Sequence, residues 1–248
     1  MSEVLALIPA RGGSKGIPRK NLLPLGGVPL IVHSVRQGLA SDTITRVIVS
    51  TDDEEIAQVA REAGAEVPFL RPAALAGDHS PDIDAFSHAL RWLEEEEGYV
   101  PELVVHLRAT CPAREVRLID AAVRKLQAAP EADSLRSVCI ALQTPFKMWR
   151  EVDGCLVPVA RVEGQPEAHS LARQQLPQVY WQNGYVDVVR PRTVLELRSM
   201  AGQVVLPFEV DQRQFDLDYP EDVPAIEEAL ERLARGEPLD PRPERHSV

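Results

Sequence analysis

The sequence of 248 residues contains few aromatic residues and no long apolar run. Aromatic residues make up 5% of the chain and hydrophobic residues 44%, a balance that is ordinary for a globular α/β protein. No apolar run reaches the roughly 20 residues that a membrane helix requires, so we expect no membrane span. The first residues lack the basic segment and the cleavage site of a signal peptide. A cytoplasmic protein is therefore expected.

Cysteine and positive charge are also scarce. The three cysteines form no CxxC pair, which argues against a structural zinc site and suits a reducing compartment. The net charge of −11 disfavours nucleic-acid binding, which relies on a basic surface. The first twenty residues reverse this sign locally, because they contain the bunched cations Arg11, Lys15, Arg19 and Lys20. Such a local basic pocket can hold an anionic substrate even in an acidic protein.

Apolar runs of strand length alternate with segments of helical spacing along residues 1–133. Strands are expected at residues 4–8, 46–50, 66–70 and 103–107, and helices at residues 30–39, from about 54, at 83–93 and at 116–126. This alternation predicts βαβ units, and hence an α/β fold with a doubly wound, mainly parallel sheet. Ligands bind such sheets beyond the carboxyl ends of the strands. The segments expected there are the loop after residue 9, residues 50–52 and residues 108–110.

The rhythm changes between residues 134 and 185, where short β-prone pieces stand among polar and proline-containing turns. We expect residues 134–185 to be an inserted subdomain. The α/β pattern then resumes, with strands expected at residues 185–189 and 203–206 and helices at 191–199 and 221–234. Residues 1–133 and 186–235 would together form the core. The tail, residues 236–248, is rich in proline and charge and is expected to be disordered.

The strongest local motif is the loop after the first expected strand, which reads Ala10-Arg11-Gly12-Gly13-Ser14-Lys15-Gly16. Paired glycines would permit a positive φ and let backbone N–H groups approach phosphate oxygens. The cations of this region could add charge-assisted hydrogen bonds to a triphosphate. The spacing matches neither the Walker A loop nor GxGxxG. A solvated basic turn is the alternative, but three cations with three glycines directly after a strand favour phosphate binding.

A second motif, Asp216-Leu217-Asp218, places two carboxylates two residues apart. On an extended segment such residues point to the same side, so the pair could share a hard cation such as Mg²⁺. That cation would neutralise charge at a reacting phosphorus. The alternative is an acidic cap for the following helix, which accounts for Glu221 and Asp222 better than for this pair.

Taken in order, these and other motifs resemble the CMP-sialic acid synthetases, also called acylneuraminate cytidylyltransferases. The family's opening, Ala-Arg-x-x-Ser-Lys-Gly closed by Lys-Asn-Leu, is matched at residues 10–16 and 20–22. Its further motifs Val-Ser-Thr-Asp, Arg-Pro-x-x-Leu-Ala-x-Asp, Arg-Gln-x-Leu-Pro, Asn-Gly and Asp-x-Asp are matched at residues 49–52, 71–78, 173–177, 183–184 and 216–218. The matches run in order to about residue 234. The ordered set is far more specific than any single motif.

The resemblance implies a fold, a reaction and a role for each matched residue. It implies a Rossmann-like nucleotidyltransferase that couples CTP to an acidic nine-carbon sugar, a nonulosonic acid, and releases pyrophosphate. The nucleotide-binding residues would be Ala10, Arg11, Gly12, Gly13, Ser14, Lys15, Lys20, Asn21, Arg71 and Ser80. The sugar-binding residues would be Arg108, Thr110, Lys147, Arg173 and Asn183. The catalytic residues would be Arg11, Lys20, Asp216 and Asp218, the last two as ligands of Mg²⁺.

The resemblance also implies a homodimer. Residues 134–185 would be a dimerisation subdomain, and Lys147 would reach the active site of the partner subunit. A general base is not evident from the sequence, and Asp211 near the acidic pair is a weak candidate.

Two departures from the family pattern border the sugar side of the expected site. Many relatives carry glutamine at the position of Arg108, where arginine could pair bidentately with a sugar carboxylate or reject an acyl group. The sequence Tyr185-Val186-Asp187-Val188 replaces the common Ala-Ile-Tyr-Ile. Sialic acid, legionaminate, pseudaminate and keto-deoxy sugar acids are therefore all open as acceptors. The rival hypotheses are a nucleotidyltransferase for another sugar acid or a sugar phosphate, and a non-catalytic relative that binds nucleotide or sugar.

Overall fold

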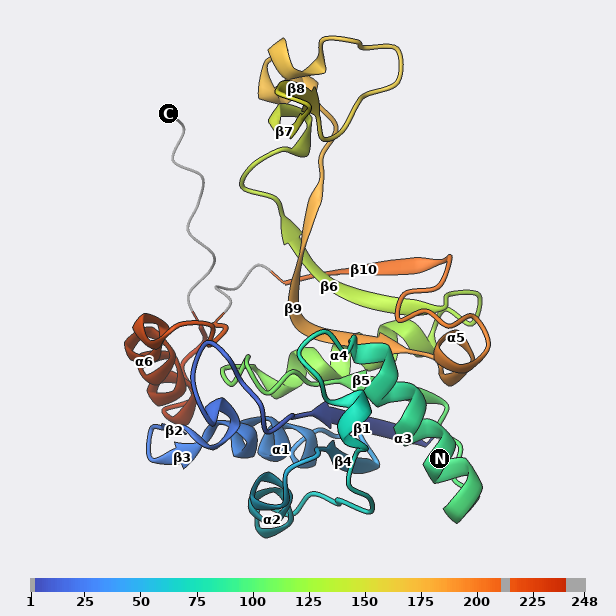
Figure 1. Ribbon diagram of the computed structural model, residues 1–248, viewed down its shortest axis with the longest axis vertical. Coiled ribbons are helices and arrows are strands. Elements are labelled where there is room, and N and C mark those ends of the chain that lie inside the picture. Colours follow the sequence, from blue (N-terminus) through green and yellow to red (C-terminus); the bar gives the residue numbers. More distant parts are fainter. Residues whose placement is uncertain (1–2, 211–214, 240–248) are drawn as a thin grey trace.

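The computed structural model describes residues 3–210 and 215–239. Its centre is a six-stranded sheet in the order β10-β6-β9-β5-β1-β4 (Figure 1). The strands are β1 (Val4–Pro9), β4 (Arg46–Ser50), β5 (Leu103–His106), β6 (Ser134–Ile140), β9 (Tyr180–Val189) and β10 (Val205–Glu209). Only β9 runs antiparallel to its neighbours in this sheet. The expected mainly parallel α/β sheet is confirmed.

Helices cover both faces of the sheet. They are α1 (Leu30–Leu39), α2 (Glu54–Glu62), α3 (Asp82–Glu97), α4 (Val116–Gln127), α5 (Pro191–Leu195) and α6 (Val223–Ala234). Because successive side chains of a strand point to opposite faces, Ala6 and Ile8 of β1 pack with α1, α2 and α4. Leu5 and Leu7 pack on the other face with α3 and α5. Burial on both faces explains why β1 is a continuous apolar run.

One expected strand is not formed, and one expected helix ends four residues early. The strand expected at residues 66–70 is wrong, because only Glu66 forms a bridge, to Ile48 of β4. Pro68 has no N–H to continue a ladder, and Leu70 is exposed. The helix expected at residues 191–199 ends at Leu195, and Arg198 takes a left-handed φ of 48° that a helix does not accommodate.

An outlying segment, residues 141–179, stands away from the body of the molecule on the ends of β6 and β9 (Figure 1). It contains the antiparallel hairpin of β7 (Trp149–Val152) and β8 (Cys155–Pro158). The expected subdomain began at residue 134 and ended at residue 185, but β6 and β9 belong to the central sheet. The sequence suggested wider limits because these strands carry the same β-prone pattern as the hairpin.

Leu239, which falls in the tail expected to be disordered, packs on the core. Leu239 is 4% exposed and lies in the apolar cluster that contains Ile226 and Ala229 of α6. The expectation of disorder for residues 240–248 concerns residues outside the described part of the chain. Among the described residues, no helix has the length and apolar character needed to cross a membrane.

Candidate active site

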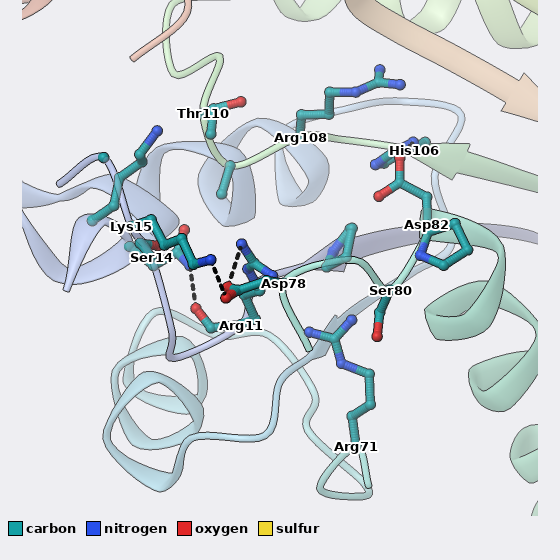
Figure 2. Close-up of a pocket in the computed structure, with 16 residues that line it drawn as sticks. Arg11, Ser14, Lys15, Arg71, Asp78, Ser80, Asp82, His106, Arg108 and Thr110 are labelled. Atoms are coloured by element: carbon teal, nitrogen blue, oxygen red, sulfur yellow. Dashed lines mark hydrogen bonds and ion pairs between the residues drawn. The ribbon is translucent and has the colours of Figure 1, made fainter. Parts of the chain in front are cut away.

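A pocket of about 440 Å³ opens at the carboxyl ends of β1 and β5, where the sequence places the glycine loop and residues 108–110 (Figure 2). The sheet order makes β1 and β5 direct neighbours, so the loops that follow them meet. The residues predicted to bind substrate that line this pocket are Arg11, Ser14, Lys15, Lys20, Asn21, Arg71, Ser80, Arg108 and Thr110. Segments more than 90 residues apart in the sequence are therefore brought together.

In the glycine loop, Gly12 lies in close contact with the residues that follow β4. The positive φ predicted for the glycines of this loop is wrong. Gly12, Gly13 and Gly16 are all absent from the residues with positive φ. Instead, a Cβ on Gly12 would lie 2.7 Å from Oδ2 of Asp53, and the Gly12 N–H donates to Oδ1 of Asp52 at 3.0 Å. Glycine is needed at this position because the loop lies directly against the residues that follow β4.

Two cations of the loop converge on one carboxylate (Figure 2). Lys15 Nζ lies 2.6 Å from Asp78 Oδ2, and Arg11 Nη2 lies 3.4 Å from Asp78 Oδ1. The hydrogen bond from Lys15, and then the nearby charges of Lys15 and Arg11, lower the pKa of Asp78. An entering phosphate would compete with Asp78 for both cations. Sequence reasoning missed this role of Asp78, which was noted only as the last residue of a family motif.

Lys20 connects the glycine loop to the acidic pair. Its Nζ donates to the backbone carbonyl of Leu217 at 2.6 Å and lies 3.7 Å from Oδ1 of Asp218. The Lys20 side chain is 12% exposed, so this contact is largely shielded from water. Asn21 supports the loop by donating from Nδ2 to the Arg11 carbonyl at 2.9 Å.

The acidic pair lines a second hollow of about 590 Å³ beside the first pocket. Asp216 Oδ1 accepts a hydrogen bond from Thr110 Oγ1 at 3.0 Å, and the backbone N–H of Leu217 donates to the Thr110 carbonyl at 2.8 Å. Burial raises the pKa of Asp216, and the charge of Asp218 adds to that rise. Both carboxylates face the same hollow, as the two-residue spacing predicts.

The residues present suit a magnesium ion that is shared with a substrate. Within the described residues, no cluster of three or more histidine, cysteine, aspartate or glutamate side chains is placed to hold a metal. Mg²⁺ commonly takes one or two carboxylates and completes its shell with phosphate oxygens and water. Asp216 and Asp218 match that donor set.

Arg108 lines both cavities and is held in place by a residue that the sequence did not single out as a contact. Its Nη1 lies 2.8 Å from Oδ2 of Asp187, which is 1% exposed. Burial opposes the charge of Arg108 most strongly, but the Asp187, Asp82 and Asp216 carboxylates together outweigh it and raise the pKa of Arg108. Arg108 thus stands between the basic pocket and the acidic hollow.

His106 is a further pocket residue that the sequence reasoning left inside a strand. It is the last residue of β5, is 1% exposed, and neither ring nitrogen has a hydrogen-bond partner within the described residues. Burial, and then the charges of Arg108 and Arg136, lower its pKa well below 6.5. His106 is therefore neutral at physiological pH. Its place at the carboxyl end of the strand was the signal that could have pointed to it.

Two predicted sugar-binding residues lie outside both cavities. Lys147 and Arg173 belong to the outlying segment, where Arg173 donates to the carbonyls of Ala141, at 3.2 Å, and Leu142. Asn183 does line the second hollow and is 3% exposed.

Other predicted residues shape the site without lining it. Ala10 is buried and its N–H donates to the Ser50 carbonyl at 2.9 Å, and Gly12 lies close to Asp53. A Cβ on Gly13 would have no atom within 4 Å, so no close approach requires glycine there. Asp211, the candidate general base, lies outside the described residues.

The topology, the basic glycine loop after β1 and the facing acidic pair define the chain as an α/β nucleotidyltransferase. Solved structures support this fold. The chain resembles CMP:2-keto-3-deoxy-manno-octonic acid synthetase with a TM-score of 0.70 and 15% identity, covering 94% of this chain and 100% of that one. It resembles 4-diphosphocytidyl-2C-methyl-D-erythritol synthase with a TM-score of 0.63 and 14% identity, covering 93% and 99%.

Sequence comparison gives the family. A profile described as Cytidylyltransferase matches residues 5–183. Post-translational flagellin modification protein B of Campylobacter coli is 31% identical over 229 residues, 92% of this chain and 94% of that protein. CMP-N,N'-diacetyllegionaminic acid synthase of Campylobacter jejuni is 30% identical over 228 residues, which cover 92% of this chain and 94% of that protein. Pseudaminic acid cytidylyltransferase of Campylobacter jejuni is 38% identical over 121 residues, 49% of this chain and about half (52%) of that protein's length. The chain belongs to the cytidylyltransferases and, among them, to the CMP-sialic acid synthetase family.

Proposed function

We propose that this chain transfers CMP from CTP to an acidic nonulosonic sugar and releases pyrophosphate in a reaction that requires Mg²⁺. The observation that carries the proposal is the position of Arg108, which lines both the basic pocket and the hollow that holds the acidic pair. Two substrates that react with each other must meet at such a junction. Relatives named for legionaminic and pseudaminic acids support an acidic sugar as the acceptor.

The basic pocket is suited to the nucleotide. Arg11, Lys15 and Lys20 can bind the triphosphate oxygens by charge-assisted hydrogen bonds. Arg71 lines the same pocket, is 7% exposed, and its buried Nε has no hydrogen-bond partner within the described residues. A buried donor of this kind is costly to leave unpaired. We assign it, with Ser80, to the cytosine and its ribose.

The acidic hollow is suited to the sugar and to the reacting end of the triphosphate. In the proposed reaction the anomeric hydroxyl attacks the α-phosphorus in line. The new O–P bond forms as the bond to pyrophosphate breaks, and the hydroxyl proton is released to water. Mg²⁺, when bound by Asp216 and Asp218, would neutralise charge on the phosphates. Lys20 lies beside the same pair and adds positive charge there. Catalysis would then come mainly from positioning and charge neutralisation.

The outlying segment is proposed to form a dimer interface. It exposes several large apolar side chains, namely Leu142, Met148, Trp149, Val152, Leu156 and Val159. Contiguous exposed apolar side chains are typical of interaction surfaces. Lys147 and Arg173 stand on this segment away from both cavities of their own chain, so a partner subunit's site is where they would act. Leu156→Glu should give a monomer in light scattering, and a dimer of unchanged stability would contradict the assignment.

The activity is tested by measuring pyrophosphate release from CTP with a panel of acidic nonulosonic and keto-deoxy sugars. Release should require both the sugar and Mg²⁺ and should stop when EDTA is added. Asp218→Asn should lower kcat by about 100-fold or more, the scale of losing one group that stabilises transition-state charge. Glu221→Gln is the matched control, because this exposed carboxylate lies outside both cavities. An unchanged rate in Asp218→Asn would refute the metal assignment, and no release with any sugar would refute the function.

A further inference from the structure

Three side chains form a row across adjacent strands behind Arg108. Asp187 of β9 is the register partner of His106 on β5 and of Arg136 on β6. Residues directly opposite each other in antiparallel strands project from the same face of the sheet. The row therefore lies on one face, the one on which Leu7 and Val104 pack against α3. Charged residues are rarely buried unless they are paired.

Asp187 is the anchor of this row. Its Oδ2 accepts from Arg108 Nη1 and Arg136 Nη1, each at 2.8 Å, and from Gln182 Nε2 at 3.2 Å. Its Oδ1 accepts from the backbone N–H of Ser137 at 3.3 Å. With four contacts and 1% exposure, the carboxylate has one fixed position in a rigid sheet.

The row and Arg108 together carry one excess positive charge. The guanidinium groups of Arg108 and Arg136 share the Asp187 carboxylate, and His106 is neutral. Arg136 is 11% exposed at its side chain and donates also to the Met200 carbonyl, whereas the Arg108 side chain is 26% exposed and lines both cavities. The excess charge therefore faces the site through Arg108, where the Asp82 and Asp216 carboxylates also act on it.

The free edge of Arg108 has the geometry to bind a second carboxylate. Nη1 is used by Asp187 and by the Gly184 carbonyl at 3.4 Å. Nε and Nη2 have no hydrogen-bond partner within the described residues. These two nitrogens form a parallel pair of donors, the arrangement that binds a carboxylate bidentately.

We propose that Asp187 is a positioning residue, which aims the free edge of Arg108 at the carboxylate of the acceptor sugar. This inference rests on the proposed function. In a 2-keto sugar acid the carboxylate and the attacking anomeric hydroxyl are on the same carbon atom. Fixing the carboxylate therefore also fixes the nucleophile relative to the α-phosphorus. Asp187 acts on sugar binding and on turnover through Arg108, without touching the substrate.

The test compares an acidic sugar with its methyl ester, which keeps the anomeric hydroxyl and loses the carboxylate charge. The wild-type protein should prefer the acid in kcat/KM. Asp187→Asn should reduce this preference by about 10- to 100-fold, the scale of a hydrogen bond to a charged group. The KM for CTP should stay within about threefold, since Asp187 touches none of the cations of the glycine loop. Arg108→Gln should reduce the preference equally, and the double variant should reduce it no further.

Asp133→Asn is the matched control. Asp133 is also a buried aspartate, 7% exposed, which accepts from the backbone N–H groups of Gln203 and Val204 and lines neither cavity. This variant should lower the Tm and leave the preference for the acid unchanged. Asp187→Glu keeps the charge but displaces the guanidinium, and it should reduce the preference even if Asp187→Asn does not fold.

The outcomes separate the inference from the function on which it rests. Wild-type activity with the acid, together with an unchanged acid preference in folded Asp187→Asn or in Asp187→Glu, overturns the positioning role alone. An effect on both substrates alike would show that Asp187 is only structural, and this too overturns it. A wild-type protein that releases pyrophosphate with no acidic sugar overturns the proposed function and the inference with it.

Discussion

Among the residues that support the site without lining it, Arg114 is the one whose replacement we expect to damage the site most. It is 2% exposed and donates to four acceptors on three segments. Nε donates to the Tyr185 carbonyl at 2.5 Å and Nη2 to the Arg108 carbonyl at 2.5 Å. Nη1 donates to Ser34 Oγ at 3.1 Å and to Gln37 Oε1 at 3.0 Å. It thus ties α1 and β9 to the loop that carries Arg108.

The substitution Arg114→Lys keeps the charge but removes the planar fork of donors. A single ammonium cannot reach acceptors on three segments at once, so at least two of the four buried acceptors lose their hydrogen bond to residue 114. The Arg108 carbonyl keeps the Ser34 hydroxyl and the Cys111 N–H as donors. Each buried polar group left unpaired costs about 1–3 kcal/mol. We therefore expect the free energy of unfolding to fall by about 3–5 kcal/mol. In a protein of this size that corresponds to a fall in Tm of roughly 10 °C.

Urea and thermal unfolding measure this loss, and pyrophosphate release reports its effect on the site. Arg117→Lys is the control, because the Arg117 side chain is 67% exposed and forms its ion pair with Glu115 outside the site. A surface pair contributes about 0–1 kcal/mol, so this variant should resemble the wild type. If Arg114→Lys unfolds within about 1 kcal/mol of the wild type, the reasoning that it supports the loop is refuted.

Three further outcomes are expected. Because His106 stays neutral in the folded protein and its pKa lies well below 6.5, the unfolded chain binds the extra proton as pH falls. The free energy of unfolding should therefore fall below pH 6.5 by up to about 1.4 kcal/mol per pH unit because of this residue. In urea titrations between pH 6.5 and 5, His106→Asn should show a weaker dependence of this free energy on pH than the wild type. An equal dependence in both proteins would contradict this. Gly12→Ala places a Cβ 2.7 Å from the Asp53 side chain, so it should lower the free energy of unfolding by about 1–3 kcal/mol. It should also raise the KM for CTP, and an unaltered KM would count against the close approach of Gly12 to Asp53. Leu239→Ala should cost about 2–3 kcal/mol in unfolding free energy, whereas a disordered residue would cost none.

Much of the fold could be predicted from local sequence alone. The helix at Leu30–Leu39 and the strand at Arg46–Ser50 have the limits that the apolar pattern predicts, because burial on one or two faces leaves a periodic signature. The strand expected at residues 66–70 failed, because a short apolar run says nothing of whether a neighbouring strand is available to pair with it.

The candidate site, like the fold, was only partly predictable from the sequence. The sequence by itself determined the glycine loop and the acidic pair, since each motif is contiguous and carries its chemistry in its own residue types. Only the tertiary structure decided that Arg108 pairs with Asp187, which lies 79 residues further along the chain. The same holds for His106, which the sequence places in a strand and the structure places in the wall of the pocket. The physical reason is that strand order and register decide which distant charges share a face, and no local pattern encodes either of them.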